Sequence, residues 1–377
     1  MKDVSVYIGR FNPFHSGHAH VLKRALETSK LVIVLVGSSG QARSLKNPFT
    51  FQERRSMIEK WHMGINGEHG ALRILPIRDY PYNDTLWIRQ VQSTVKEAIA
   101  EYNFGDIDAH LSDVYLTGSD RDESTWYLQS FRQWKQDLVE PYREDGSLNV
   151  SATQIRDWLF TNTDIELQGK MAKMMPASTL KFLSSWVQSH SAAYESLKQE
   201  YRFIEKYKKD WSAAPYPVTF TTVDAVVVQS GHVLVVKRGH QPGKGLWALP
   251  GGFLNQGEKL RDGAVRELVE ETGIRLAIGK NAKEITSNIL KGSIRDYEVF
   301  DHPGRSLRGR TITTAFYFRL DDTKPLPPVS AGSEDADAPD EILDCKWITV
   351  DEALERTDMW FEDHAAILET MIGGKDL

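Results

Sequence analysis

Short apolar runs rich in β-branched residues alternate with longer amphipathic stretches through the first 160 residues of the chain. The apolar runs lie at 4–8, 31–36, 72–77 and 114–117. Helical composition marks 51–61 and 87–101 between them. Strands that alternate with helices form a parallel sheet covered on both faces. The pattern therefore predicts an α/β domain that binds its ligands at the carboxyl ends of the strands.

The rest of the chain follows a different pattern. Residues 164–211 are predicted to be wholly helical, and the segment 213–217 (AAPYP) ends that helical region. Beyond it we expect strands at 218–229, 233–237, 311–319 and 345–348, a helix at 259–272 and terminal helices. This order is typical of an α/β/α sandwich. The predicted organisation is a domain at 1–185, a helical linker at 186–214 and a second domain at 215–377.

A phosphate site is predicted where the first strand meets the first helix. The connecting segment is 9–18 (GRFNPFHSGH), and the helical stretch after it reaches residue 29. Free backbone N–H groups and the positive end of the helix attract phosphate at such a junction. His15 and His18 are three residues apart at the start of the helix, so both can point at the same phosphate.

A second motif, at 150–156 (VSATQIR), fits the same chemistry. Ser151 or Thr153 can cap a helix whose N-terminus meets phosphate, and Arg156, one turn further on, can donate two hydrogen bonds to phosphoryl oxygens. Together the two segments resemble the HxGH and SxTxxR signatures of the nucleotidylyltransferases of the HxGH superfamily. The resemblance implies that the second motif closes the active site built by the first.

Three segments between these motifs narrow the resemblance. They are 47–54 (NPFTFQER), 83–88 (NDTLWI) and 117–120 (TGSD). The ensemble, over about residues 1–180, resembles the nicotinamide-mononucleotide adenylyltransferases of the short, archaeal type. The resemblance implies adenylyl transfer from ATP to nicotinamide mononucleotide, giving NAD and pyrophosphate, with Mg²⁺ bridging the phosphates. The alternative is nucleotidyl transfer to another phosphate, such as phosphopantetheine.

The same resemblance assigns roles to individual residues. His15, His18 and Arg156 would be catalytic, with the histidines on the α- and β-phosphates and the arginine on the departing pyrophosphate. Trp87 would stack on the nicotinamide ring, although an aromatic at this position is also compatible with the core. The remaining substrate-binding candidates are Gly9, Arg10, Phe11, Asn47, Asp84, Gly118, Asp120, Ser151 and Thr153.

Three glutamates in the predicted helix at 259–272 point to a metal site. Glu267, Glu270 and Glu271 stand at i, i+3 and i+4, so their carboxylates share one face. Like charges so placed repel by about 0.2–0.5 kcal/mol per pair on an exposed helix. Hard oxygen ligands suit Mg²⁺ or Mn²⁺. A solvated acidic face is the alternative.

The sequence around these glutamates decides between the two. The stretch 252–274 (GFLNQGEKLRDGAVRELVEETGI) fills every fixed position of the Nudix box, and the segment is identified as a member of that family. Gly273 stands where a helix end favours a left-handed residue. The resemblance implies metal-dependent hydrolysis of a nucleoside diphosphate, with Glu267 and Glu271 catalytic. Glu258 is left with two roles, metal ligation or support of Arg266.

The substrate of this half is predicted from a basic segment. Residues 301–311 (DHPGRSLRGRT) resemble the P-x-R-x-x-R-G-R segment of ADP-ribose-directed Nudix proteins, which implies that Arg305, Arg308 and Arg310 bind ADP-ribose. Cleavage would give AMP and ribose 5-phosphate. The alternatives are another nucleoside diphosphate or a non-catalytic ADP-ribose sensor. The candidates for a further base or ligand are Glu334, Asp335, Asp337 and Glu341.

Composition limits the remaining possibilities. The fold class is predicted as α/β: a Rossmann-like nucleotidylyltransferase domain joined by the helical linker to a Nudix α/β/α sandwich. A net charge of −6 gives no footprint for nucleic acid. The single cysteine, Cys345, excludes an internal disulfide and fits a reducing, cytoplasmic location. The first strand begins too early for a signal peptide, and no apolar run near it spans a membrane. The oligomeric state stays open, a homo-oligomer included.

Overall fold

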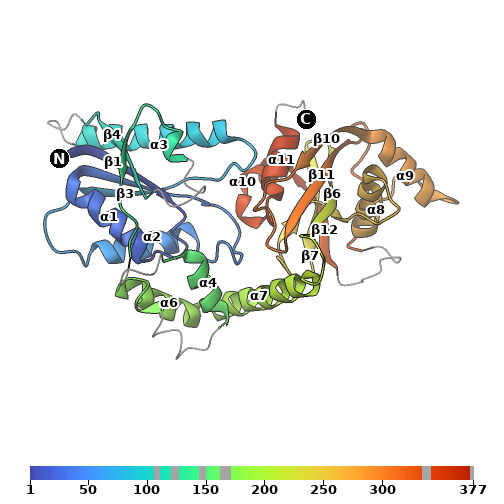
Figure 1. Cartoon of the computed structure of the whole chain (residues 1–377). Helices are drawn as coiled ribbons and strands as arrows, with labels where there is room; N and C mark the ends of the chain where they lie inside the picture. The colour runs from blue at the N-terminus through green and yellow to red at the C-terminus, as the bar shows by residue number, and fades with distance from the viewer. Residues whose placement is uncertain (106–110, 120–126, 144–149, 162–170, 333–340, 374–377) are drawn as a thin grey trace. The chain divides into compact units, whose positions relative to one another are not determined.

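The computed structural model describes residues 1–105, 111–119, 127–143, 150–161, 171–332 and 341–373. The chain divides into two compact units, Met1–Lys198 and Gln199–Leu377. Each unit is built around its own β-sheet (Figure 1). Among the described residues, no helix has both the length and the apolar character needed to cross a bilayer.

The sheet of the first unit is parallel throughout, as predicted. Its order is β3-β2-β1-β4-β5, with β1 at Lys2–Gly9, β2 at Ser29–Val36, β3 at Ala71–Pro76, β4 at Val114–Gly118 and β5 at Lys135–Leu138. Strand β5 has no counterpart in the sequence prediction. Its sequence, KQDL, is mostly polar and exposed, so it lacks the apolar pattern of a buried strand and forms by pairing with β4 at the sheet edge.

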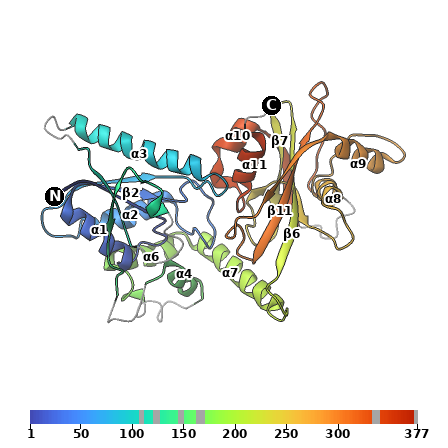
Figure 2. The same cartoon turned by 45° about the horizontal axis from the view of Figure 1, so that its top comes forward.

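Helices cover both faces of this sheet. The helices of this unit are α1 (Ser16–Thr28), α2 (Phe51–His62), α3 (Asp84–Gly105), α4 (Ala152–Thr161), α6 (Ala177–Ser189), which packs on α2, and the start of α7 (Ser191–Trp211). Helix α3 lies on one face, with α1 and α2 on the other (Figures 1 and 2). Alternate residues of β2 therefore point into two different apolar layers. Leu31, Ile33 and Leu35 pack in the layer that includes Val91 and Val95 of α3.

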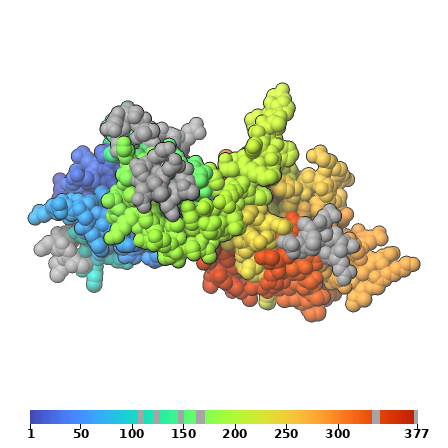
Figure 3. All heavy atoms as spheres, turned by 90° about the horizontal axis from the view of Figure 1, so that it is seen from below, coloured from blue at the N-terminus to red at the C-terminus, as the bar shows by residue number. Residues whose placement is uncertain are grey.

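The helical region before the second sheet is not continuous. His190, with φ −121° and ψ 38°, ends α6, and α7 begins at the next residue. Residues 172–174 form a turn, and 162–170 lie outside the described residues. Helix α6 forms part of the surface of the first unit (Figure 3). The predicted helical composition is therefore right for 177–211 apart from one break.

The second unit is a sandwich of a mixed sheet between helices. Strands β6 (Thr219–Gln229), β7 (His232–Arg238), β10 (Ile294–Phe300), β11 (Arg310–Arg319) and β12 (Ile342–Thr349) follow the order β10-β11-β6-β7-β12. The short β8 (Trp247–Ala248) and β9 (Gly251–Phe253) pair with β7 and β6. Helices α8 (Leu260–Thr272) and α9 (Ala282–Ser293) lie on one face and α10 (Val350–Glu355) and α11 (His364–Ile372) on the other (Figures 1 and 2). The α/β/α prediction is confirmed.

Helix α8 begins and ends where the sequence predicts. Lys259 is its N-cap residue, and Gly273 closes it with φ 53° and a backbone N–H bonded to the Val269 carbonyl. A left-handed residue costs little only at glycine. Strands β9 and β10 and helix α9 are not in the sequence prediction, because β9 is too short for a period to show and β10 is mostly exposed.

Candidate active sites

In the first unit, the two histidines of the HxGH segment lie together at the start of α1. His15 is the N-cap residue, and its Nδ1 accepts from the backbone N–H of His18 at 3.4 Å. The Nδ1 of His18 in turn accepts from the backbone N–H of His15 at 3.3 Å. The two rings stack with centroids 3.6 Å apart. A reciprocal capping box is thus made from imidazoles, and it places both rings at the helix end that attracts anions.

The loop before the histidines is shaped by a glycine and a phenylalanine. Phe11 has a left-handed backbone, with φ 51°, and its ring folds back over Gly9. A Cβ atom on Gly9 would lie 2.9 Å from the Phe11 Cζ, so no larger residue fits. Both residues were predicted to bind substrate; in the structure they determine the shape of the loop that carries Arg10, which is exposed.

The SxTxxR motif reaches this loop from far along the chain. Arg156 of α4 donates from one terminal nitrogen to the Asn12 carbonyl at 2.8 Å and from the other to Thr153 Oγ1 at 3.1 Å. Ser151 directly precedes the helix. Burial lowers the pKa of Arg156 to about 10, and the nearby charge of Arg10 acts in the same direction. The guanidinium is still a cation at neutral pH.

The segment 47–54 ends in a second buried arginine, Arg54, to which the sequence pattern assigns no role. Arg54 of α2 is only 1% exposed. Its guanidinium donates to the backbone carbonyls of Arg10 at 2.8 Å, Gly37 at 2.6 Å and Ser38 at 3.2 Å. Burial lowers the pKa of Arg54 to about 10. Arg54 therefore ties together the loops that follow β1 and β2, which the sequence pattern alone does not indicate.

The predicted binding residue Asn47 contacts the HxGH loop directly. Its side-chain oxygen accepts from Asn12 Nδ2 at 3.3 Å, and its own amide donates to Gln41 at 2.6 Å. Asn12 also accepts from the backbone N–H of Phe49 at 3.3 Å. The segment between β2 and α2 is therefore attached to the loop that carries the catalytic candidates.

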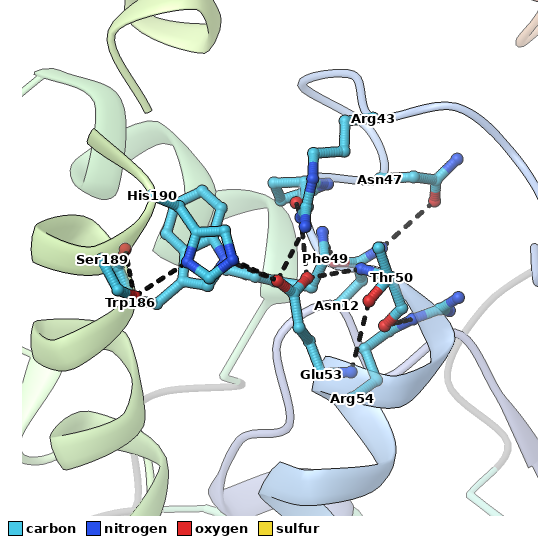
Figure 4. Close-up of polar contacts among 11 residues, drawn as sticks. Asn12, Arg43, Asn47, Phe49, Thr50, Glu53, Arg54, Trp186, Ser189 and His190 are labelled. Carbon is cyan, nitrogen blue, oxygen red and sulfur yellow. Dashed lines mark hydrogen bonds and ion pairs between the residues drawn. The ribbon is translucent and has the colours of Figure 1, made fainter. Parts of the chain in front are cut away.

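Glu53 holds the same segment from the other side (Figure 4). Its carboxylate accepts hydrogen bonds from both terminal nitrogens of Arg43, at 2.7 Å, and from the backbone N–H of Thr50, at 2.7 Å. The indole of Trp186 in α6 donates to it at 2.8 Å, and His190 Nε2 lies 3.6 Å away. Burial raises the pKa of Glu53, but these donors outweigh it, and the net pKa is lowered.

Trp87, the predicted nicotinamide-stacking residue, is partly buried on α3. Its ring packs against Tyr127 and Phe131, with centroids 6.2 and 5.8 Å away. It also belongs to the margin of the apolar layer under α3. Trp87 therefore lies at the boundary between the core and the surface. This position is compatible with stacking on the nicotinamide ring and with a structural role in the core.

The other candidates of this half occupy separate positions. Asp84 is exposed and begins α3. Gly118 ends β4, and a Cβ atom there would lie 2.9 Å from Leu128 Cδ2. Asp120 lies outside the described residues. Gly118 is therefore explained by close packing, whatever it contributes to binding.

In the second unit, two of the three glutamates converge on a pair of glycines. Glu271 accepts the backbone N–H of Gly251 at 2.8 Å. A Cβ atom on Gly252 would lie 2.5 Å from Glu267 Oε1. Glycines at 251 and 252 are thus required so that strand β9 can approach the carboxylates. Both glutamates lie on the same side of α8, as their i, i+4 spacing predicts.

The electrostatics of this pair are unfavourable in the protein alone. Burial raises the pKa of Glu267 to about 7, with Glu270 and Glu341 adding to the effect against the charge of Arg266. Burial and the neighbouring Glu267 raise the pKa of Glu271 well above its ordinary value. A divalent cation between the two would favour their ionised forms, and carboxylate oxygens are the ligands that Mg²⁺ and Mn²⁺ prefer. The donor set fits such an ion.

Glu270 does not face the same point. It accepts from Arg266 at 2.9 Å, one turn earlier on α8, and the same guanidinium contacts Glu267 at 2.9 Å. Glu267 and Glu270 therefore share one guanidinium nitrogen of Arg266, while Glu271 is bonded to Gly251. Within the described ranges no three His, Cys, Asp or Glu side chains are gathered around one ion position. Residues at i+3 and i+4 are neighbours, and here Arg266 decides which way Glu270 points.

The open question about Glu258 is answered by where the helix begins. Glu258 precedes the first turn of α8, and its two oxygens accept from Arg266 at 2.8 and 3.0 Å. Arg266 also donates to the Phe253 carbonyl at 3.2 Å. In this structure Glu258 supports Arg266.

The three arginines of the basic segment have different surroundings. Arg305 is buried, and Asp363 accepts from it at 2.9 and 3.0 Å. The guanidinium of Arg308 lies 5.4 Å from the centre of the ring of Phe253, the last residue of β9. Arg310 is half-buried and donates to the backbone carbonyl of Asp301. Arg308 is thus the one of the three placed next to β9.

Sequence reasoning missed Arg238 at the end of β7. Its guanidinium lies 4.0 Å from the centre of the Phe361 ring. Burial and Arg308 lower the pKa of Arg238, while Glu271 and Glu341 act in the opposite direction, so all of these charges are close together. No local motif marks this arginine. Of the four candidates for a further base, Glu341 is the one that lies within the described residues; Glu334, Asp335 and Asp337 fall outside them.

Comparisons with known proteins agree with both halves. A cytidylyltransferase-like family model matches residues 6–158, and a NUDIX domain model matches 218–370. A crystal structure of a bifunctional NMN adenylyltransferase/ADP ribose pyrophosphatase from Francisella tularensis is 32% identical, covers 99% of both chains and superposes with a TM-score of 0.82. A second structure of that protein, complexed with AMP and Mn ion, gives 0.80 at the same identity and coverage.

Relatives of the first half alone are also found. The nicotinamide/nicotinic acid mononucleotide adenylyltransferase of Acinetobacter baylyi is 34% identical over 201 residues, which are 53% of this chain and 94% of the relative. The nicotinamide-nucleotide adenylyltransferase of Archaeoglobus fulgidus is 38% identical over 92 residues, about half (52%) of its length.

The folds and sites define a nucleotidylyltransferase joined to a Nudix hydrolase. More particularly, the chain belongs to the family of bifunctional nicotinamide-mononucleotide adenylyltransferase/Nudix hydrolase enzymes.

Proposed function

We propose that the first unit makes NAD by transferring the adenylyl group of ATP to nicotinamide mononucleotide, and that the second hydrolyses ADP-ribose to AMP and ribose 5-phosphate. The observation that carries the first activity is the meeting of Arg156 with the HxGH loop, at the Asn12 carbonyl. The convergence of Glu267 and Glu271 on Gly251 and Gly252 carries the second.

Adenylyl transfer needs no general base. The phosphate of nicotinamide mononucleotide is largely a dianion at neutral pH, because its second pKa is near 6. It attacks the α-phosphorus of ATP; a new P–O bond forms, and the bond to the β-phosphate oxygen breaks, releasing pyrophosphate. The protein contributes position and charge. His15 and His18 bind the phosphates around the reacting phosphorus, and Arg156 and Arg10 stabilise the charge on the pyrophosphate.

Substrate selection in this unit is assigned to the residues around the loop. Trp87 stacks on the nicotinamide ring, with its other contacts to Tyr127 and Phe131 holding the indole in place. Asn47 lines the nucleotide site, held there by Asn12 and Gln41. A phosphopantetheine acceptor would leave the face of Trp87 without a ring to stack on.

Hydrolysis in the second unit is assigned to the glutamate pair. Glu267 and Glu271 would hold a divalent cation, Mg²⁺ or Mn²⁺, and such an ion would supply polarisation of the diphosphate and a lowered pKa of the attacking water. The Gly251 N–H fixes the position of one carboxylate, and Arg266 draws Glu270 toward Glu258. Arg308 and Arg238 carry positive charge beside the site and bind the anionic substrate.

One experiment tests both activities. The purified protein is incubated with ATP and nicotinamide mononucleotide, and separately with ADP-ribose and a panel of other nucleoside diphosphates, with Mg²⁺ or Mn²⁺. Products are separated by chromatography. We expect NAD in the first reaction, and AMP with ribose 5-phosphate in the second. Binding of ADP-ribose without turnover would instead identify the second unit as a sensor, and faster cleavage of another diphosphate would reassign its substrate.

A further inference from the structure

Residues 360–364 (WFEDH), which lead into the first residue of α11, contact several parts of the hydrolytic site in succession. The backbone N–H of Phe361 donates to the Trp247 carbonyl at 2.8 Å, and its ring lies under Arg238. The next residue, Glu362, has a carboxylate oxygen 3.8 Å from Arg308. This segment is therefore attached both to the strand that leads into the glycine pair and to the arginines beside it.

Asp363 and His364 continue the series with the closest contacts. Asp363 accepts both hydrogen bonds of Arg305, at 2.9 and 3.0 Å, in a pair that is almost wholly buried. His364 Nδ1 accepts the backbone N–H of Leu249 at 2.9 Å. Leu249 stands two residues before Gly251, whose own N–H is bonded to Glu271. His364 is thus bonded to the turn that receives a catalytic carboxylate.

The state of the His364 ring follows from its partners. Because Nδ1 accepts a hydrogen bond, the proton of the neutral ring is on Nε2, which lies 4.0 Å from Asp224 Oδ1. Asp224 also accepts from Thr313 Oγ1 at 2.5 Å. Burial lowers the pKa of His364, and this effect outweighs the opposite effect of the Asp224 charge. Burial thus favours the neutral ring. Asp224 pairs with Gly251 across β6 and β9, so the acid, the histidine and the glycine turn form one buried unit.

Packing alone does not explain these polar residues. Trp360 and Phe361 already fill the apolar space at this point. Buried charges contribute little to stability compared with apolar residues of the same shape. Glu362 also has a left-handed backbone, with φ 45°, a conformation that costs energy for any residue but glycine and persists where the surroundings impose it. Such features gather at functional sites.

We propose that Asp363 and His364 are positioning residues of the hydrolytic site. His364 holds the turn 249–252 so that the Gly251 N–H meets Glu271, and Asp363 holds the Arg305 loop that carries Arg308. Neither residue touches the reacting atoms. The inference rests on the proposed hydrolase function and assigns residues that no motif in the sequence marks.

The test exploits the geometry of the acceptor atom. Asparagine Oδ1 is as many bonds from Cβ as histidine Nδ1, so His364→Asn keeps the acceptor for Leu249, whereas His364→Gln displaces it and His364→Leu removes it. We expect His364→Leu and His364→Gln to lower kcat for ADP-ribose by about 10- to 100-fold, as for outer partners of metal sites, with little change in KM. We expect His364→Asn to retain most of the wild-type kcat. Mn²⁺ affinity, measured by electron paramagnetic resonance, should follow the same order.

A companion variant tests Asp363. Asp363→Asn removes the charge that faces Arg305, and we expect a KM for ADP-ribose raised about tenfold, since the loop that carries Arg308 is loosened. Asp351→Asn, on the exposed first turn of α10, is the matched control and should behave as wild type. Circular dichroism and thermal melting of each variant report whether the second unit, which holds these residues, is folded.

The outcomes separate the inference from the function on which it rests. Wild-type kcat and Mn²⁺ affinity in a folded His364→Leu, or equal losses in the Asn and Gln variants, would overturn the positioning role. If His364→Leu fails to fold, the comparison of Asn with Gln decides. If wild-type protein does not cleave ADP-ribose, the proposed function fails, while the order of Mn²⁺ affinities still decides whether His364 positions the glutamate site.

Discussion

The first unit buries cations around its candidate site, whereas the second buries anions. Arg54 and Arg156 keep a pKa of about 10 despite burial, so the protein itself supplies positive charge at neutral pH. Burial raises the pKa of Glu267 to about 7 and raises the pKa of Glu271 well above its ordinary value, so a cation beside the pair would favour its ionised form. The two units therefore bring protein charges of opposite sign to the same kind of substrate group, the phosphate of a nucleotide.

The difference teaches where a metal ion is needed to complete the site. In the first unit both arginines donate to backbone carbonyls, so the chain itself places their positive charges. In the second, a cation must intervene between two carboxylates and an anionic diphosphate. We therefore expect the second site to depend on divalent metal for its geometry, and the first to keep its shape without it.

The largest effect is expected from Glu271→Gln. The variant keeps the shape of the side chain but removes the charge that binds the cation, so ADP-ribose hydrolysis should fall by orders of magnitude and excess Mg²⁺ should not restore it. The melting temperature without metal should stay level or rise, since repulsion between Glu267 and Glu271 is relieved. Steady-state turnover and thermal melts with and without Mg²⁺ measure both. Undiminished hydrolysis would show that Glu271 is not a ligand.

Next in size is His18→Ala. Loss of a positioned donor to phosphate should lower adenylyl transfer by about 10²–10³-fold. Hydrolysis by the same protein should stay near wild type, because the two units have separate cores. Both activities are measured on one preparation. A folded variant that loses both would contradict the independence of the two sites.

A smaller effect is expected from Trp87→Ala. Stacking of an aromatic pair contributes about 0.5–1.5 kcal/mol, which corresponds to a KM for nicotinamide mononucleotide raised about 2- to 10-fold. The KM for ATP should change less, because the ring would contact only the nicotinamide. Initial rates with each substrate varied in turn give both constants. Equal changes for the two substrates would return Trp87 to a purely structural role in the core.

The smallest effects are expected in the pH dependence of folding stability, where Glu53 and Glu267 should act with opposite signs. The pKa of Glu53 is lowered from 4.5 in the folded protein, so its stabilising contribution is present above pH 4.5 and is lost as the pH falls through the folded value. The pKa of Glu267 is raised to about 7, so without metal the wild type loses stability as the pH rises from 4.5 to 7.

Urea unfolding of Glu53→Gln and Glu267→Gln in a chelator, at several pH values between 4 and 8, tests these opposite signs. Glu53→Gln should be less stable than wild type at pH 7 and approach it at pH 4. Glu267→Gln should be more stable than wild type at pH 8 and approach it at low pH. The same sign for both variants would mean that the two carboxylates do not differ in their surroundings as described.

Local spacing was enough to predict the elements that carry the chemistry. The i, i+3 histidines lie at the start of α1, the i, i+4 glutamates on one side of α8, and Gly273 at its end, because all three depend on helix geometry within one or two turns. The parallel sheet of the first unit also follows from alternating apolar runs. The edge strand β5 was missed, since a polar strand is specified by its neighbour rather than by its own sequence.

The sequence by itself thus marked the residues expected at phosphate or metal: His15 and His18 in one half, and Glu267, Glu270 and Glu271 in the other. Only the tertiary structure decided their partners. Arg156 bonds to the Asn12 carbonyl, 144 residues earlier in the chain, and Arg305 is buried because Asp363, 58 residues later, faces it. A helix or strand sets the direction of a side chain over a few residues, but the group it meets comes from elements far along the chain, and burial makes that choice strong.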